Sequence, residues 1–149
     1  MEKLNNKYKN LCKIYSRLSR IQQKYTNPPS YADEEDMEAY MTTMVKRFEL
    51  TFELLWKFLK FYLKFSQGID TLGSKDVIRR SLNLGLVTEH EGQALLDIVE
   101  ERNAVAHDYD EDRARELCEK IVHGYYQMFS EIVPRLEKFT KNEKNEEVK

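Results

Sequence analysis

The sequence predicts an all-α fold, an antiparallel bundle of four main helices with one short extra helix. Apolar residues recur at every third or fourth position along most of the chain, which is the period of an amphipathic helix. Among 149 residues there are only five glycines and three prolines, and 34% are charged, a composition that favours long, salt-bridged helices over a sheet with many turns. We expect one domain over residues 1–139 and a charged, disordered tail over 140–149.

The first two helices are expected over about residues 2–25 and 34–66. The apolar stripe of the first begins at Leu4 and ends near Ile21, and Pro28 and Pro29 follow, where consecutive prolines cannot continue a helix. The stripe of the second helix is made of large apolar residues, namely Met41, Val45, Phe48, Phe52, Leu55, Leu59 and Tyr62. It is expected to be longer than the first.

The second half of the chain predicts a short helix and two longer ones. The short helix covers about residues 74–84 and is closed by Gly85 at the position where glycine often ends a helix. Thr88 and Glu91 have the spacing of a capping box, which opens the helix that carries Arg102. The last helix is expected over about residues 110–139, bent or broken near Pro134.

Charge and composition exclude several classes of protein. A formal net charge of −2 argues against a basic surface that coats nucleic acid, although it leaves room for a small basic cleft. Cys12 and Cys118 form no metal-type pair and no disulfide framework, as in a reduced cytoplasm. The N-terminus has no signal-peptide core, and no apolar run reaches the ~20 residues of a membrane span. We expect a soluble cytoplasmic protein with no membrane partner, metal or cofactor.

Three other patterns have ordinary structural explanations. Residues 68–75 resemble a Walker A loop with the last two residues exchanged, but they follow a helix where that motif follows a strand. His90 and His123 have no other metal-type ligand at the required spacing and are expected on the surface. The aromatic residues of the second helix are expected in the bundle core rather than on a base-stacking platform, namely Phe48, Phe52 and Trp56.

The segment over residues 101–109 contains the strongest functional signal. Arg102 shares a helical stripe with Leu95 and Val99, so its guanidinium is expected on the buried face. A buried guanidinium is costly unless it is paired. Arg102 therefore either forms a structural salt bridge with a carboxylate, such as Glu49 or Glu53 of the second helix, or belongs to a site that handles anions.

His107 and Tyr109 complete this segment. In an ideal helix Arg102 and His107 would lie about 140° apart, so they converge only if the helix ends or distorts near residue 106 or 107. If residues 107–109 are extended, His107 and Tyr109 point to the same side. The spacing therefore suits a site at the C-terminus of a helix, where the helix dipole also favours a cationic imidazole.

Together, Arg102, Asn103, His107 and Tyr109 resemble the R-x4-H-x-Y signature of HEPN domains. The resemblance is more specific to one branch, the nucleotidyltransferase substrate-binding proteins found beside minimal nucleotidyltransferases. It covers about residues 40–138, and the segments that carry it lie at 46–57, 76–80, 85–87 and 100–103. The first forty residues contain no diagnostic motif.

This resemblance implies a HEPN-like bundle that forms a homodimer, with two copies of the motif around a shared cleft. Many HEPN proteins are metal-independent ribonucleases, and several are toxins whose antitoxin is the companion nucleotidyltransferase. In some pairs the antitoxin transfers AMP to the motif tyrosine. For this chain the resemblance implies catalytic roles for Arg102 and His107, supporting roles for Asn103 and Glu49, and modification of Tyr109.

The chemistry of RNA cleavage suits these residues. RNA carries its own nucleophile in the 2′-hydroxyl, so cleavage needs a proton shuttle, for which His107 is suited, and charge stabilisation, for which Arg102 is suited. The alternative, which the older family name implies, is a non-catalytic subunit that presents a substrate to the nucleotidyltransferase. The two hypotheses differ in whether the purified dimer cuts RNA in EDTA.

Overall fold

The computed structural model describes residues 2–105 and 111–141, and within these ranges every regular element is helical. The elements are α1 (Glu2–Thr26), α2 (Glu34–Gln67), α3 (Ser74–Asn83), α4 (Glu89–Val105), α5 (Glu111–Lys120), the π-helix η1 (Ile121–Tyr125) and α6 (Tyr126–Arg135). A short helical segment follows over residues 137–141. The all-α fold and the order of the helices confirm the prediction. None of the described helices combines the length and apolar character needed to cross a membrane.

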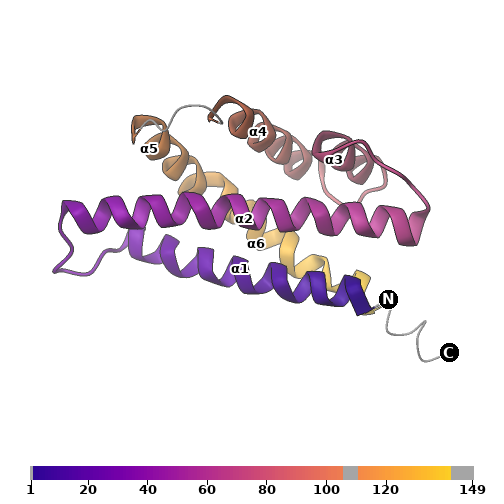
Figure 1. The fold of residues 1–149 in the computed structure, drawn as a ribbon, viewed down its shortest axis with the longest axis horizontal. Coiled ribbons are helices and arrows are strands. Elements are labelled where there is room, and N and C mark those ends of the chain that lie inside the picture. Colours follow the sequence, from indigo (N-terminus) through magenta and orange to yellow (C-terminus); the bar gives the residue numbers. More distant parts are fainter. Residues whose placement is uncertain (1, 106–110, 142–149) are drawn as a thin grey trace.

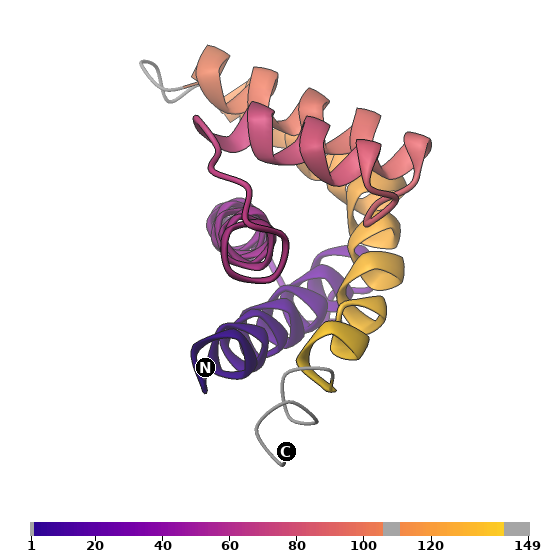
Figure 2. The same cartoon turned by 90° about the vertical axis from the view of Figure 1, so that its right-hand side faces the viewer.

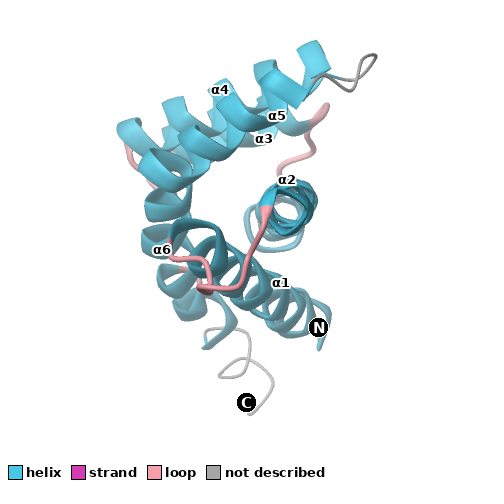
Figure 3. Ribbon diagram, turned by 90° about the vertical axis from the view of Figure 1, so that its left-hand side faces the viewer, coloured by secondary structure: helices cyan, strands magenta, loops and turns pink. Residues whose placement is uncertain are grey.

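Helix α2 is the centre of the fold. It lies antiparallel to α1, while α3 and α4 lie on its other side and the last helix crosses behind it (Figure 1). Seen along α2, the other helices surround it on three sides and leave one side uncovered (Figures 2 and 3). Five members of the expected apolar stripe of α2 are buried in the core, namely Met41, Phe48, Phe52, Leu55 and Leu59, whereas Val45 and Tyr62 are half-buried. Phe58 and Leu63 of α2 are fully buried as well.

Local sequence explains where the helices begin and end. The backbone N–H of Asp36 donates to Asp33 Oδ1 over 2.8 Å, and the N–H of Asp33 donates to Asp36 Oδ2 over 3.1 Å, so the two residues cap the start of α2. The predicted Thr88–Glu91 capping box is present, with distances of 2.8 and 3.1 Å. Gly85, with φ +73°, adopts the left-handed conformation predicted after the short helix.

The last helix differs from the prediction in one respect. It is interrupted at residues 121–125, where the π-helix η1 inserts an extra residue into the turn. The side chain of Gln127 donates to the carbonyl of Val122 over 2.7 Å, which gives that carbonyl a partner. The predicted break near Pro134 is confirmed, because α6 ends at Arg135, directly after the proline, which has no N–H to donate.

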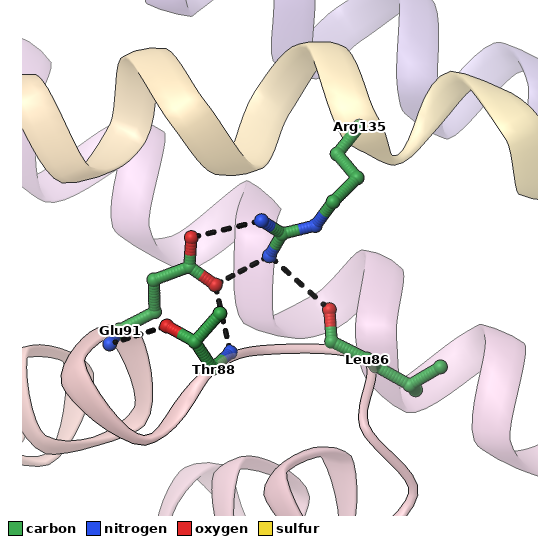
Figure 4. A network of polar contacts seen from close by, with 4 residues as sticks. All are labelled: Leu86, Thr88, Glu91 and Arg135. Atoms are coloured by element: carbon green, nitrogen blue, oxygen red, sulfur yellow. Dashed lines mark hydrogen bonds and ion pairs between the residues drawn. The ribbon is translucent and has the colours of Figure 1, made fainter.

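A nearly buried ion pair joins the start of α4 to the end of α6 (Figure 4). Arg135 Nη1 donates to Glu91 Oε2 over 2.9 Å, and Nη2 contacts Oε1 of the same carboxylate and the carbonyl of Leu86. Only 2% of the Glu91 side chain is exposed, compared with 31% of Arg135. Glu91 therefore both caps α4 and attaches it to the last helix.

The surroundings of Glu91 keep its carboxylate ionised. Burial acts to raise the pKa of Glu91, but hydrogen bonds from Arg135 and from the backbone of Thr88 outweigh it, and the pKa is lowered overall. A carboxyl group whose pKa is lower in the folded state contributes stability above its unfolded pKa. That contribution to stability is lost as the pH falls through the pKa that the carboxyl group has in the folded state.

We predict that Arg135→Ala lowers the free energy of unfolding by about 3 kcal/mol at pH 7, because it leaves a buried carboxylate without its cation. Urea denaturation measures this loss. The difference from wild type should narrow as the pH falls, first because the unpaired Glu91 carboxyl of the variant takes up a proton, and then because the wild type loses its ion pair as the pH passes through its own lowered pKa. In the matched control, Arg115→Ala breaks an exposed pair with Glu111 and should cost less than about 1 kcal/mol. Equal losses in the two variants would contradict the role of this ion pair.

Candidate functional site

Arg102 lies near the C-terminal end of α4 and faces α2. Its Nη1 atom donates to Glu53 Oε2 over 3.0 Å. The guanidinium carbon lies 5.4 Å from the centre of the Phe52 ring, within cation–π range. Of the two expected partners on the second helix, the described structure therefore pairs Arg102 with Glu53 and not with Glu49, which is half-buried one turn earlier.

The expectation that Arg102 lies on a buried face is wrong for its side chain, of which 38% is exposed. Leu95 and Val99 on the same stripe are buried, as predicted. The reason for the difference is the length of arginine, whose guanidinium covers the Phe52 ring on one side and remains partly exposed to solvent. The guanidinium is thus held in place by protein contacts and remains accessible to an anion.

Glu53 connects several groups around Arg102. Its carboxylate also accepts a hydrogen bond from Trp56 Nε1 over 3.0 Å and pairs with Lys57 over 3.1 Å. Burial acts to raise the pKa of Glu53, but the bonds from Trp56, Arg102 and Lys57 together lower it. Arg102 and Lys57 thus share one ionised carboxylate.

A second ion pair holds the same end of α4, and the sequence analysis missed it. Glu101, next to Arg102, pairs with Lys120 at the start of the π-helix. Burial and the charge of Glu101 raise the pKa of Tyr125 to about 12. The ring of Tyr125 stacks on Phe48 of α2, with centroids 5.6 Å apart. No local pattern could have identified a pair that is separated by 19 residues.

Other predicted site residues lie beyond what the structure describes. Asn103 continues the backbone of α4, whose described part ends at Val105. His107 and Tyr109 lie outside the described residues, and their approach to Arg102 stays a prediction.

The remaining candidate residues have structural surroundings. His90 is exposed, and His123 is a surface residue 3.2 Å from Glu119, as predicted. Phe48 and Phe52 are core residues, whereas Trp56 is half-buried beside Glu53.

Across residues 2–105 and 111–141, no three histidine, cysteine or acidic side chains are grouped to hold a metal ion. Cys12 and Cys118 are free thiols, and burial raises the pKa of Cys118 to about 12.

Comparisons with known proteins agree with this architecture. A crystal structure of a protein from Thermus thermophilus is 26% identical, with a TM-score of 0.66 over 85% of this chain and 98% of the other. The crystal structure of a mutant of the toxin–antitoxin MntA–HpeT contains a chain that shares the fold, at 15% identity and a TM-score of 0.71, over 89% of this chain and 98% of that one. No curated protein matches.

One family model spans nearly the whole described fold. It matches residues 6–138, from the first turns of α1, through the Arg102–Glu53 contact, to the segment after Pro134. The chain therefore belongs to the family of nucleotidyltransferase substrate binding protein like proteins.

Proposed function

We propose that this protein is the toxin subunit of a two-component toxin–antitoxin module. In this proposal it is a metal-independent endoribonuclease that acts as a homodimer, and a partner nucleotidyltransferase neutralises it. The observation that carries the proposal is the state of Arg102, a guanidinium held by Glu53 and Phe52 yet 38% exposed at the end of α4. An arginine in that state can contact a phosphate without first being reordered.

The proposed reaction divides the chemistry between two residues. His107 removes the proton from the RNA 2′-hydroxyl, the 2′-oxygen forms a bond to phosphorus, and the bond to the 5′-oxygen breaks. A protonated His107 then supplies the proton that the leaving 5′-oxygen needs. Arg102 stabilises the negative charge that grows on the phosphate oxygens. Asn103 and Glu49 are proposed to support this arrangement from neighbouring positions.

The proposed partner follows from the family and from the fold neighbour. The family takes its name from a nucleotidyltransferase, and the structure with TM-score 0.71 is that of a toxin–antitoxin. We propose that the partner transfers AMP from ATP to Tyr109, so that the phenol oxygen forms a bond to the α-phosphorus and pyrophosphate leaves. The added phosphate would compete with RNA for Arg102, and the adenosine would block access to the cleft.

The family name favours a second candidate, a non-catalytic subunit that binds a substrate for the nucleotidyltransferase. Both functions predict a nucleotidyltransferase partner. They differ in RNA cleavage by the purified protein in EDTA, which the ribonuclease proposal requires and the binding-subunit proposal does not.

The first prediction for this function is a homodimer, because the proposed cleft needs an Arg102 from each of two chains. Light scattering should give about twice the chain mass of 17.8 kDa. A monomer at micromolar concentration would contradict the shared cleft.

The second prediction concerns catalysis. His107→Ala should abolish RNA cleavage in EDTA and relieve growth inhibition, with an unchanged helical circular dichroism spectrum, because the proton shuttle is lost while the helices remain. Arg102→Ala should also abolish cleavage, at a loss of only about 1 kcal/mol in the free energy of unfolding, since the pair with Glu53 is partly solvated. The control Arg80→Ala removes an exposed arginine that pairs with Asp76 and should keep full activity. Full cleavage by His107→Ala, or a strict need for a divalent metal, would contradict the proposed mechanism.

The third prediction concerns control by the partner. Wild-type protein incubated with the nucleotidyltransferase, ATP and magnesium should gain the mass of one AMP, located by mass spectrometry on the peptide that contains Tyr109. Tyr109→Phe removes the acceptor oxygen, so it should gain no mass and should stay toxic in the presence of the partner. An equal mass gain in Tyr109→Phe would place the modification elsewhere, and occlusion of the cleft would then be the leading explanation.

A further inference from the structure

A wide groove lies between the C-terminal half of α1 and the N-terminal half of α2, away from Arg102. It encloses about 1040 Å³. Its charged lining residues are all cations, Arg17, Arg20 and Lys24 from α1 and Arg47 from α2, and Tyr40 and Thr43 contribute to the α2 wall. In a chain with a formal net charge of −2, four cations in one groove without a carboxylate are an unusual concentration of positive charge.

The cations of the groove are available to a ligand. Arg17, Arg20 and Lys24 are exposed, and within residues 2–105 and 111–141 none of the four forms an ion pair with a carboxylate. Arg47 Nη1 donates to the backbone carbonyl of Arg17 over 2.8 Å, which holds the α2 side chain across the groove. The positive charge is therefore not neutralised within the described chain, and one of its carriers is already ordered.

The spacing of these residues suits a chain of phosphates. Arg17, Arg20 and Lys24 follow one another at intervals of three and four residues, so they form a row along α1 with about 5–6 Å between neighbours. That interval is comparable with the distance between successive phosphates of a single nucleic acid strand. Tyr40 in the wall adds an aromatic ring, the second component of grooves that hold single strands.

The charges around the groove favour one path for such a strand along the surface. A neighbouring hollow at the same end of the molecule is lined by the carboxylates of Glu34, Glu35, Glu38 and Glu111, which would repel a polyanion. In the other direction, Lys46 is exposed next to Arg47. Lys46 is also seven residues before Glu53 and thus on the same face of α2, about 10 Å along the helix from the Arg102 pair, with the half-buried carboxylate of Glu49 between them.

We propose that this groove binds the sugar–phosphate backbone of single-stranded RNA and leads it past Lys46 to Arg102. The inference rests on the proposed ribonuclease function, because it concerns the substrate of that site. It adds a binding surface outside the R-x4-H-x-Y segment, with Arg17, Arg20, Lys24 and Arg47 as its phosphate contacts.

The test measures binding separately from cleavage. His107→Ala protein keeps the probe intact, and fluorescence anisotropy gives its affinity for a fluorescein-labelled single-stranded RNA at several salt concentrations. Adding Arg20→Ala and Lys24→Ala removes two phosphate contacts, so the slope of log affinity against log salt should become shallower by about 1.4 and affinity at 0.1 M salt should fall about 25-fold. The matched control adds Lys60→Ala and Arg79→Ala, which remove one exposed lysine and one exposed arginine outside the groove and should change affinity less than about twofold.

The outcomes separate this proposal from the ribonuclease proposal. If the wild type cleaves RNA in EDTA but the groove variant binds RNA as tightly as the control variant, the groove proposal is overturned and the ribonuclease proposal stands. If RNA affinity falls in the groove variant alone while the wild type never cleaves in EDTA, the groove stands and the ribonuclease proposal fails. Unchanged RNA affinity, together with a lost interaction with the nucleotidyltransferase or an altered dimer mass, would assign the groove to an acidic protein surface instead.

Discussion

The position of α4 depends on the ion pair between Glu91 and Arg135. A carboxylate with 2% exposure would be strongly unfavourable without compensation, and here one arginine and one capping box supply it together. The same side chain thus starts α4 and attaches it to the last helix. At the other end of α4, Glu101 pairs with Lys120. These two contacts, about ten residues apart, act together with the buried side chains of Leu95, Ile98 and Val99 to hold the helix that presents Arg102.

The Arg102 side chain is ordered by its contacts and yet remains partly solvated, two properties that rarely occur together. Its pair with Glu53 and its contact with Phe52 order the side chain, as in a structural salt bridge. Yet Glu53 also binds Lys57, so the carboxylate is shared, and the guanidinium remains partly solvated and positively charged. A guanidinium of this kind contacts a phosphate at a low entropic cost, because its rotamer is already selected. The structural and functional explanations of Arg102 are therefore compatible.

The distribution of charge around the groove between α1 and α2 says more about its ligand than the net charge of the chain does. The formal charge of −2 gives little indication of nucleic acid binding, but the fold separates the charges at one end of the molecule. Cations from α1 and α2 meet in one groove, and acidic residues from α2 and α5 line the neighbouring hollow. Because α1 and α2 are antiparallel (Figure 1), the C-terminal half of α1, with three of the cations, lies beside the N-terminal half of α2. A single strand of RNA could follow the positive surface towards Arg102.

Local features of the sequence determined the helices, their caps and the core stripe of α2, because periodicity, capping residues and prolines act within a few positions. They also suggested Glu49 and Glu53 as examples of a partner for Arg102. The π-helix at residues 121–125 escaped prediction, since one inserted residue changes the apolar pattern very little. Tertiary structure alone selected Glu53, 49 residues from Arg102, joined Glu91 to Arg135 across 44 residues, and assembled the basic groove. Such contacts depend on how helices pack, and packing angles and rotations are set by the whole core rather than by neighbours in sequence.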